Sequence, residues 1–220
     1  SIATETGDDV LIGDGGVVQF SERRLQRIAS VFAETDPLIS YADKIYGDNG
    51  DDVIIGGRGG DSVLAGGHGP GRGVTDPGVR DEDIIIGDNG ELIYHDKSIL
   101  ANFGKLCLVR TTDDANETGG ADTAYGELGD DIILGGVNSS TDTLNGNEGN
   151  DVILGDNGLL NFTYGSDTNP ATLDLIQSFI DGLGGTDVIS GNAGEDVILG
   201  GTGGDTIYGD NVGMTAGSDD

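Results

Sequence analysis

The sequence predicts an all-β repeat fold, and three observations support this prediction. Glycine occupies 42 of the 220 positions, far above the usual ~7%, without the three-residue period of collagen. Glycine and aspartate recur together every nine residues, with a large apolar residue at a fixed distance from the aspartate. A longer similarity of about 70 residues is superimposed on the nine-residue period, as in proteins built from stacked repeats.

The nine-residue period is clearest where Gly47–Ile55 is followed directly by Gly56–Leu64. Glycine fills the first and fourth positions, aspartate the sixth, and a large apolar residue the eighth. The same register begins again at Gly126, Gly146, Gly191 and Gly200. Including looser copies, the sixth-position aspartates are Asp9, Asp43, Asp52, Asp61, Asp83, Asp122, Asp131, Asp142, Asp151, Asp187, Asp196 and Asp205.

The eighth-position residues are expected to stack inward as the core, because β-branched and other large apolar side chains suit short strands. They are Leu11, Ile45, Ile54, Val63, Ile85, Ile133, Leu144, Ile153, Ile189, Ile198 and Ile207. Glycine in the turns permits positive φ and lets backbone carbonyls converge on one point. Carboxylates and carbonyls together form the oxygen-rich ligand set that Ca²⁺ prefers.

The repeated motif resembles the RTX, or haemolysin-type, calcium-binding nonapeptide G-G-x-G-x-D-x-U-x, where U is a large apolar residue. The resemblance implies a parallel β-roll, a β-solenoid in which six residues turn, three form a strand, and successive units alternate between two sheets. It also implies that Ca²⁺ lies between turns, held by aspartate carboxylates and backbone carbonyls. The twelve sixth-position aspartates are therefore the candidate metal ligands. The alternative is a disordered glycine- and aspartate-rich linker, above all without calcium.

The net charge of −30 excludes several partners and favours cations. Nucleic acid and anionic membranes are disfavoured, and no apolar run reaches the ~20 residues that span a bilayer. Every Lys and Arg lies at or before Arg110, so the second half of the chain contains acids and no basic side chain. Calcium ions on the order of ten would offset much of this charge, and we expect their binding to drive folding.

The longer period aligns Asp9–Phe20, Asp83–Tyr94 and Asp151–Phe162. It divides one continuous roll into three superrepeats, at residues 1–82, 83–150 and 151–220, and Gly217–Asp220 resembles the start of a further copy. We expect about three coils in each superrepeat, about nine in all. In the second turn of each superrepeat the sixth position is apolar, and the eighth is Phe20, Tyr94 or Phe162, which we expect to fill the core of the roll.

An insertion follows each altered turn, at residues 19–42, 95–118 and 163–181. The first predicts a helix at about residues 21–33, with Ser21 as N-cap and Leu25, Ile28 and Phe32 on one face. The third predicts a helix at about residues 170–181, capped by Asn169. The middle insertion predicts an extended Leu106–Val109 preceded by a hairpin turn at residues 102–105.

The seventh and ninth positions alternate in polarity along the chain. Apolar pairs are Val10/Ile12, Val53/Ile55, Ile84/Ile86, Ile132/Leu134, Val152/Leu154 and Val197/Leu199, whereas Lys44/Tyr46, Thr123/Tyr125, Thr143/Asn145 and Thr206/Tyr208 are mixed or polar. One sheet should therefore have an apolar outer face that needs cover. Either the insertions or another chain could supply it.

The motifs of common hydrolases, metalloproteases and nucleotide-binding enzymes are missing from the sequence. His68 and His95 are isolated, and Cys107 lies in an apolar run where we expect it to be a buried small hydrophobe. We predict no catalytic residue and no enzymatic activity.

Three functions remain open. The first is a calcium-binding structural module of a secreted filament, surface layer, adhesin or matrix protein, which would associate with identical repeats end to end. The second is the calcium-binding block of a secreted enzyme or toxin whose active domain lies elsewhere. The third is a binding module whose loops at residues 68–80 and 95–118 hold a partner such as a glycan. The resemblance implies bacterial export by type I secretion to the extracellular space or the cell surface.

Overall fold

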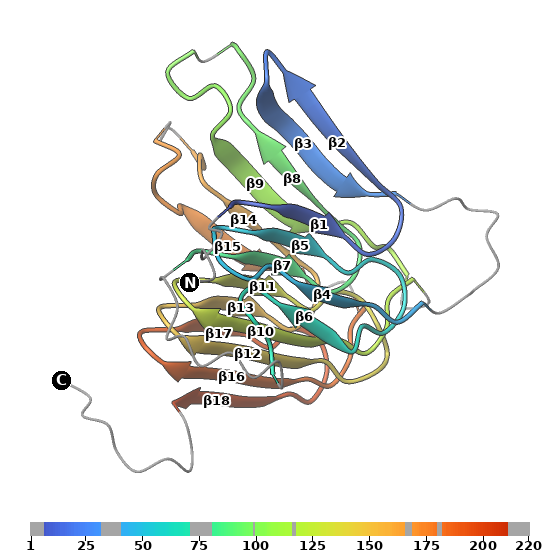
Figure 1. Ribbon diagram of the computed structural model, residues 1–220. Coiled ribbons are helices and arrows are strands. Elements are labelled where there is room, and N and C mark those ends of the chain that lie inside the picture. Colours follow the sequence, from blue (N-terminus) through green and yellow to red (C-terminus); the bar gives the residue numbers. More distant parts are fainter. Residues whose placement is uncertain are drawn as a thin grey trace, which may run out of the picture.

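The structure is a computed structural model that describes residues 7–31, 41–70, 81–98, 100–115, 118–165, 169–179 and 182–210. These residues form eighteen strands in three six-stranded sheets, and no helix occurs among them (Figure 1). The all-β prediction is therefore confirmed. In this part of the chain there is accordingly no helix long and apolar enough to cross a membrane.

Two of the sheets are parallel and together form a β-roll. The sheet in the middle of the molecule, called here the central sheet, contains β1 (Val10–Ile12), β5 (Val53–Ile55), β7 (Ile84–Ile86), β11 (Ile132–Leu134), β13 (Val152–Leu154) and β17 (Val197–Leu199). The other, called the outer sheet, contains β4 (Lys44–Tyr46), β6 (Val63–Ala65), β10 (Thr123–Leu128), β12 (Thr143–Glu148), β16 (Val188–Ala193) and β18 (Thr206–Asp210). The strands follow one another in chain order within each sheet, so the expected parallel β-roll is confirmed.

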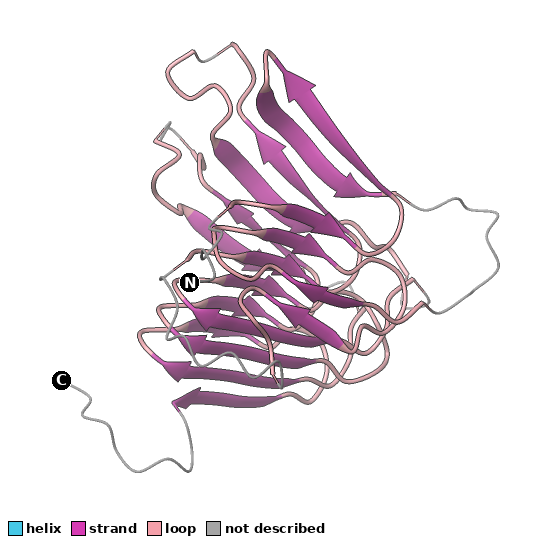
Figure 2. Cartoon of the chain, viewed as in Figure 1, coloured by secondary structure: helices cyan, strands magenta, loops and turns pink. Residues whose placement is uncertain are grey.

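The third sheet is antiparallel and lies against the free face of the central sheet (Figure 2). It contains β2 (Gly16–Ser21), β3 (Arg24–Ser30), β8 (Gly90–Tyr94), β9 (Leu106–Thr111), β14 (Gly158–Asn161) and β15 (Leu175–Ser178). Each stretch of about 70 residues thus contributes two strands to each of the three layers.

The core between the central and outer sheets consists of eighth-position residues, as expected. Its fully buried members include Ile54, Ile85, Ile133, Leu144 and Ile153. Two positions differ from the prediction. Ile207, in the last rung, is 47% exposed and lies outside this core. Leu64, rather than Val63, points into the core, because β6 pairs with β4 in the register Ile45↔Leu64 and one extra residue follows the aspartate of that turn.

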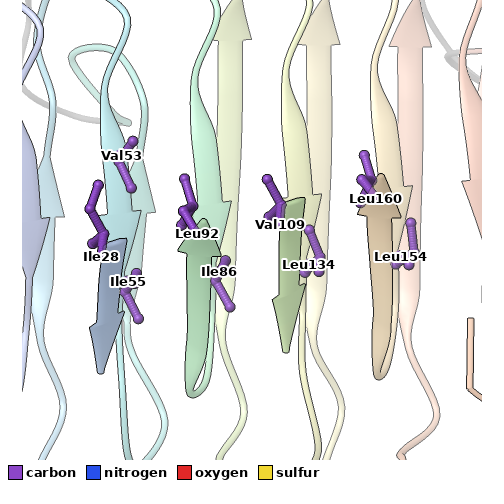
Figure 3. Packing of buried hydrophobic residues seen from close by; sticks show 9 residues of the cluster. All are labelled: Ile28, Val53, Ile55, Ile86, Leu92, Val109, Leu134, Leu154 and Leu160. Atoms are coloured by element: carbon purple, nitrogen blue, oxygen red, sulfur yellow. The ribbon is translucent and has the colours of Figure 1, made fainter. Parts of the chain in front are cut away.

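A second core joins the central sheet to the antiparallel sheet. Figure 3 shows side chains of the antiparallel sheet facing seventh- and ninth-position residues of the central sheet. The cluster consists of Ile28, Leu92, Val109 and Leu160 on one side and Val53, Ile55, Ile86, Leu134 and Leu154 on the other. The apolar outer face predicted from the sequence is therefore present, and this chain covers it itself.

The segments that cover the central sheet are strands, so the two helices predicted in the first and third insertions are wrong. After β2 the chain turns at Glu22 and Arg23, which have φ of 51° and 66°, and returns as β3, which also pairs with β8. In the third insertion Asn169 caps only one turn, since its Oδ1 accepts a hydrogen bond from Ala171 N at 3.2 Å before the chain extends into β15. Pairing with a neighbouring strand outweighs a local helical pattern in both cases. Residues 32–33 and 180–181 of the predicted helices lie outside the described residues.

The middle insertion follows its prediction in part. Leu106–Val109 is extended within β9, as expected. Residues 102–105 form a turn at the end of the longer connection between β8 and β9, where Gly104 has φ of 81° and Lys105 N donates to Asn102 O at 2.9 Å. Cys107 is half-buried rather than fully buried, and its Sγ lies 3.4 Å from Thr163 Oγ1.

The expectation of about nine coils is not confirmed, because the described residues give each parallel sheet six strands. The altered second turn of each superrepeat leaves the roll and enters the antiparallel sheet instead. Its aromatic residues therefore do not fill the roll: Phe20 is 63% exposed, and Tyr94 and Phe162 pack beside the second core. Gly217–Asp220 lies outside the described residues.

Candidate metal sites

The sixth-position aspartates form two ladders, one at the turns that enter the central sheet and one at the turns that enter the outer sheet. In each step the backbone N–H of one aspartate donates to Oδ1 of the aspartate in the next rung. Typical distances are 2.8 Å from Asp83 N to Asp131 Oδ1 and 2.9 Å from Asp122 N to Asp142 Oδ1. All ten steps that connect the twelve residues are present. The ladders thereby fix the orientation of ten of the twelve carboxyl groups, all except those of Asp9 and Asp43 in the first rungs.

The second carboxylate oxygen of most of these aspartates is buried without a hydrogen-bond partner. This holds for Oδ2 of Asp52, Asp61, Asp83, Asp122, Asp131, Asp151 and Asp187. A buried acceptor left unpaired costs about 1–3 kcal/mol, and more when it is charged. These oxygens therefore require a ligand or a proton.

Each of these oxygens faces the glycine at the first position of a turn. A Cβ added to Gly126 would lie 2.3 Å from Asp131 Oδ2 and 2.6 Å from Gly146 O. A Cβ on Gly56 would lie 2.1 Å from Asp61 Oδ2 and 2.3 Å from Gly87 O. Carboxylate and carbonyl oxygens thus surround a small space that only glycine leaves open. This donor set suits a hard cation such as Ca²⁺.

The electrostatics of the ladders are unfavourable without a cation. Burial, together with the charge of neighbouring aspartates, raises the pKa of Asp83 and Asp131 to about 8. The same causes raise the pKa of Asp61 to about 7 and that of Asp187 to about 6, although backbone hydrogen bonds act in the opposite direction. Among the described residues no Lys or Arg forms an ion pair with a sixth-position aspartate.

The predicted ligands are not equivalent in burial. Eight of the twelve lie in interior rungs and are almost fully buried, whereas Asp9, Asp43, Asp196 and Asp205 occupy the end rungs and are partly or fully exposed. Within the described ranges no three Asp, Glu, His or Cys side chains converge on one point. Any ion at the ladders would therefore be held by few carboxylates and by several carbonyl oxygens.

A second set of aspartates, at the turn's second position, was not among the predicted ligands. Asp14, Asp88 and Asp156 follow strands β1, β7 and β13, where the chain leaves the roll for the antiparallel sheet. Asp156 Oδ1 accepts from Gly185 N at 2.9 Å and Asp88 Oδ1 accepts from Gly120 N at 2.9 Å. The sequence signal is a Gly-Asp pair that recurs at the same place in all three superrepeats.

Comparison with known proteins agrees with this geometry. The family model described as the RTX calcium-binding nonapeptide repeat matches residues 1–17, 40–67, 118–139, 137–158 and 180–211, which together make up more than half of the chain. The unmatched stretches contain most of the antiparallel sheet. No curated protein and no solved structure gives a match.

Proposed function

Because the chain belongs to the family of RTX calcium-binding nonapeptide repeats, we propose that its sixth-position aspartates hold a series of calcium ions and that binding these ions folds the roll. The observation that carries the proposal is the row of buried, unpartnered Oδ2 atoms, each facing a glycine and one or more carbonyl oxygens. Calcium would supply the positive charge that the second half of the chain lacks.

Ion binding and folding are coupled in this proposal. The sites combine oxygens from successive rungs, so they do not exist in an extended chain, and binding free energy becomes folding free energy. Equilibrium dialysis against Ca²⁺ measures the number of ions per chain. We expect a number on the order of ten, since the rungs contain twelve sixth-position aspartates. A chain that binds no calcium would contradict the proposal.

We propose further that the protein acts outside the cell as a structural module rather than as an enzyme. RTX repeats are typical of secreted bacterial proteins. Weak calcium sites stay empty at cytosolic calcium concentrations, so the chain would remain unfolded for export and would fold outside. The extended parallel edges of the roll support a role in assembly, since an exposed strand edge is a template for another strand.

The proposed assembly is end-to-end stacking of identical rolls. Among the described residues, the ladders end with the carboxyl groups of Asp9 and Asp43 at one end and with the backbone N–H groups of Asp196 and Asp205 at the other. A second copy on the same axis would continue both ladders. It would also cover side chains of the last rung, where Val197 is 43% and Ile207 47% exposed.

Light scattering coupled to size-exclusion chromatography, in saturating calcium, tests the stacking. The mass of the assembly should grow with protein concentration. Ile207→Lys places a charge at the end rung and should shift the protein to monomers, whereas the control Leu100→Lys, at a residue that is 79% exposed on the β8–β9 connection, should not. A wild type that is monomeric at every concentration contradicts stacking, and so does equal assembly of Ile207→Lys.

A further inference from the structure

We propose that Asp88 and Asp122, together with the carbonyl oxygen of Val137, form an additional calcium site that the nonapeptide pattern does not contain. Asp88 occupies the second position of its turn, not the sixth, and Val137 lies in a turn of unusual length. The inference extends the proposed calcium binding and assigns a ligand role to a residue that the repeat motif leaves unassigned.

Asp88 differs from its two counterparts in the other superrepeats. It is fully buried at 0% exposure, its Oδ1 accepts from Gly120 N, and its Oδ2 has no hydrogen-bond partner. Oδ2 of Asp14 accepts from Arg58 N at 2.6 Å, and Oδ2 of Asp156 accepts from Thr202 N at 2.5 Å. Only in the middle superrepeat is this oxygen therefore left without a donor.

The length of the facing turn explains the difference. The turns at Gly56–Asp61 and Gly200–Asp205 have the standard six residues, whereas the turn at Gly135–Asp142 is two residues longer. Asn138 holds the longer turn in place, since its Nδ2 donates to both carboxylate oxygens of Asp142 at 3.0 Å. In the shorter turns, the N–H of the third residue donates to Oδ2 of Asp14 or Asp156. Asp88 Oδ2 receives no such hydrogen bond.

In place of that donor, the longer turn presents an acceptor. A Cβ added to Gly119 would lie 2.1 Å from Asp88 Oδ2 and 2.2 Å from Val137 O. Two oxygens, one of them anionic, thus border a space of about the size of a methyl group. Two acceptors cannot satisfy each other, whereas a cation between them satisfies both.

Asp122 supplies a second carboxylate to the same region. Its Oδ2 is also buried and unpartnered, and it faces Gly87, the residue directly before Asp88. Burial raises the pKa of Asp88, and the charges of Asp122 and Asp142 raise it further. The pKa of Asp122 is raised by its own burial and by the charge of Asp142. Two adjacent buried carboxylates with carbonyl oxygens around them fit one divalent hard cation.

An ion at this place would connect three segments of the chain. Asp88 begins the path into β8, Gly119 and Gly120 lie on the return from the antiparallel sheet, and Val137 belongs to the turn between β11 and β12. Calcium would therefore fasten the antiparallel sheet to the roll in the middle superrepeat, where the other two superrepeats use a backbone hydrogen bond.

Native mass spectrometry of the calcium-loaded chain tests the site by counting ions. We expect Asp88→Asn to bind one ion fewer than the wild type, while the matched variant Asp156→Asn keeps the wild-type number, because both oxygens of Asp156 already accept backbone hydrogen bonds. Equal numbers for the wild type and Asp88→Asn overturn this inference. A wild type without calcium overturns the proposed function instead.

Infrared spectroscopy of the wild type decides the question even if Asp88→Asn does not fold. The alternative to a metal ion is a proton shared between Asp88 and Asp122, which produces the C=O band of a protonated carboxyl group. We expect no such band in the calcium-loaded protein at pH 7. A protonated-carboxyl band that persists in saturating calcium contradicts the site.

Discussion

The roll and the antiparallel sheet both bury acidic side chains, but they neutralise them differently. In the roll, eight sixth-position aspartates are almost fully buried, and they receive only backbone N–H donors except for Asp142, which also receives Asn138 Nδ2. In the antiparallel sheet, Glu91 is 4% exposed and receives Arg27 Nε at 2.8 Å and Arg110 Nε at 2.7 Å from the two neighbouring strands. One region contains its own counter-charge and the other does not.

The pKa values of the two regions move in opposite directions for this reason. Burial alone would raise the pKa of Glu91, but the hydrogen bonds and charges of Arg110 and Arg27 outweigh it, so its pKa is lowered. Burial raises the pKa of Asp142 to about 8, because no basic side chain opposes it. The buried Glu91 of the antiparallel sheet thus has its counter-charges within the chain, whereas the buried aspartates of the roll depend on cations from solution.

Among the tests of this difference between the roll and the antiparallel sheet, we expect pH to have the largest effect, through the folding of the roll. Several roll aspartates have folded-state pKa values of about 6 to about 8, above the ordinary value of 3.8. The calcium-free fold therefore loses stability as the pH rises through this range, and protons compete with calcium as the pH falls.

Circular dichroism in EGTA at pH values from 8 to 4 measures this effect, and calcium titrations at pH 8 and 7 provide the comparison. In EGTA, the β-signal should increase as the pH is lowered from 8 toward 4, because the folded state binds protons that the unfolded chain does not. The calcium concentration at half-folding should change little between pH 8 and 7, since the carboxylates are ionised both in the unfolded chain and in the calcium-bound fold. A β-signal in EGTA that does not depend on pH contradicts the repulsion between buried carboxylates.

The second comparison concerns the apolar contact that joins the regions. Leu92 is fully buried between the antiparallel and central sheets, so Leu92→Ala should lower the free energy of unfolding in calcium by about 2–5 kcal/mol. Ile93→Ala, at the half-buried neighbouring residue on the opposite face, is the control and should cost less. Equal losses would mean that the two sheets do not depend on each other.

Asp131→Asn tests the roll. It replaces an unpartnered buried carboxylate, so stability in saturating calcium should fall by about 1–3 kcal/mol and the calcium midpoint should rise. In EGTA the sign should reverse, because the variant no longer buries a charge, so the β-signal of Asp131→Asn should persist to higher pH than that of the wild type. Asp130→Asn, at the exposed neighbour, is the control for both measurements. Destabilisation by Asp131→Asn in EGTA as well would show that the carboxylate has a purely structural role.

Glu91→Gln tests the antiparallel sheet. The change leaves Arg27 and Arg110 without their buried anion, so the free energy of unfolding in saturating calcium should fall by about 1–3 kcal/mol. The number of calcium ions per chain should stay the same, as native mass spectrometry can establish. If Glu91→Gln bound fewer calcium ions than the wild type, the antiparallel sheet would also depend on calcium, and the proposed difference between the two regions would be wrong.

The smallest effect is expected at the surface of the antiparallel sheet. Lys97 Nζ lies 2.6 Å from Glu22 Oε1, and both side chains are more than half exposed. Water and salt screen such a pair, so Lys97→Ala should leave the thermal midpoint of the calcium-loaded protein unchanged within error. A clear loss would mean that exposed ion pairs contribute to this sheet.

The roll could be predicted from the sequence because each of its features repeats. The position of Ile54 or Ile133 is fixed by its distance from the preceding aspartate, and the apolar pair Val53/Ile55 marks the sheet that needs cover. The error of register in the core, Val63 for Leu64, arises where a single residue is added after Asp61, which the period cannot reveal.

The antiparallel sheet could not be predicted in the same way, because its strands obtain their partners from distant parts of the chain. Arg24–Ser30 carries apolar residues at helical spacing, yet β3 pairs with β2 and with β8, which lies some 60 residues further on. The special environment of Asp88 was also invisible in the sequence, since it depends on a longer turn that only the fold brings beside it.

The central claim is that calcium ions hold the roll together against the repulsion of its own aspartates. Far-UV circular dichroism of the full chain, recorded during a titration from excess EGTA to excess Ca²⁺ at pH 7.5, tests it most directly. The account predicts a disordered spectrum in EGTA that changes cooperatively to a β-spectrum as calcium is added. A β-spectrum that is already complete in EGTA and unchanged by calcium would contradict it.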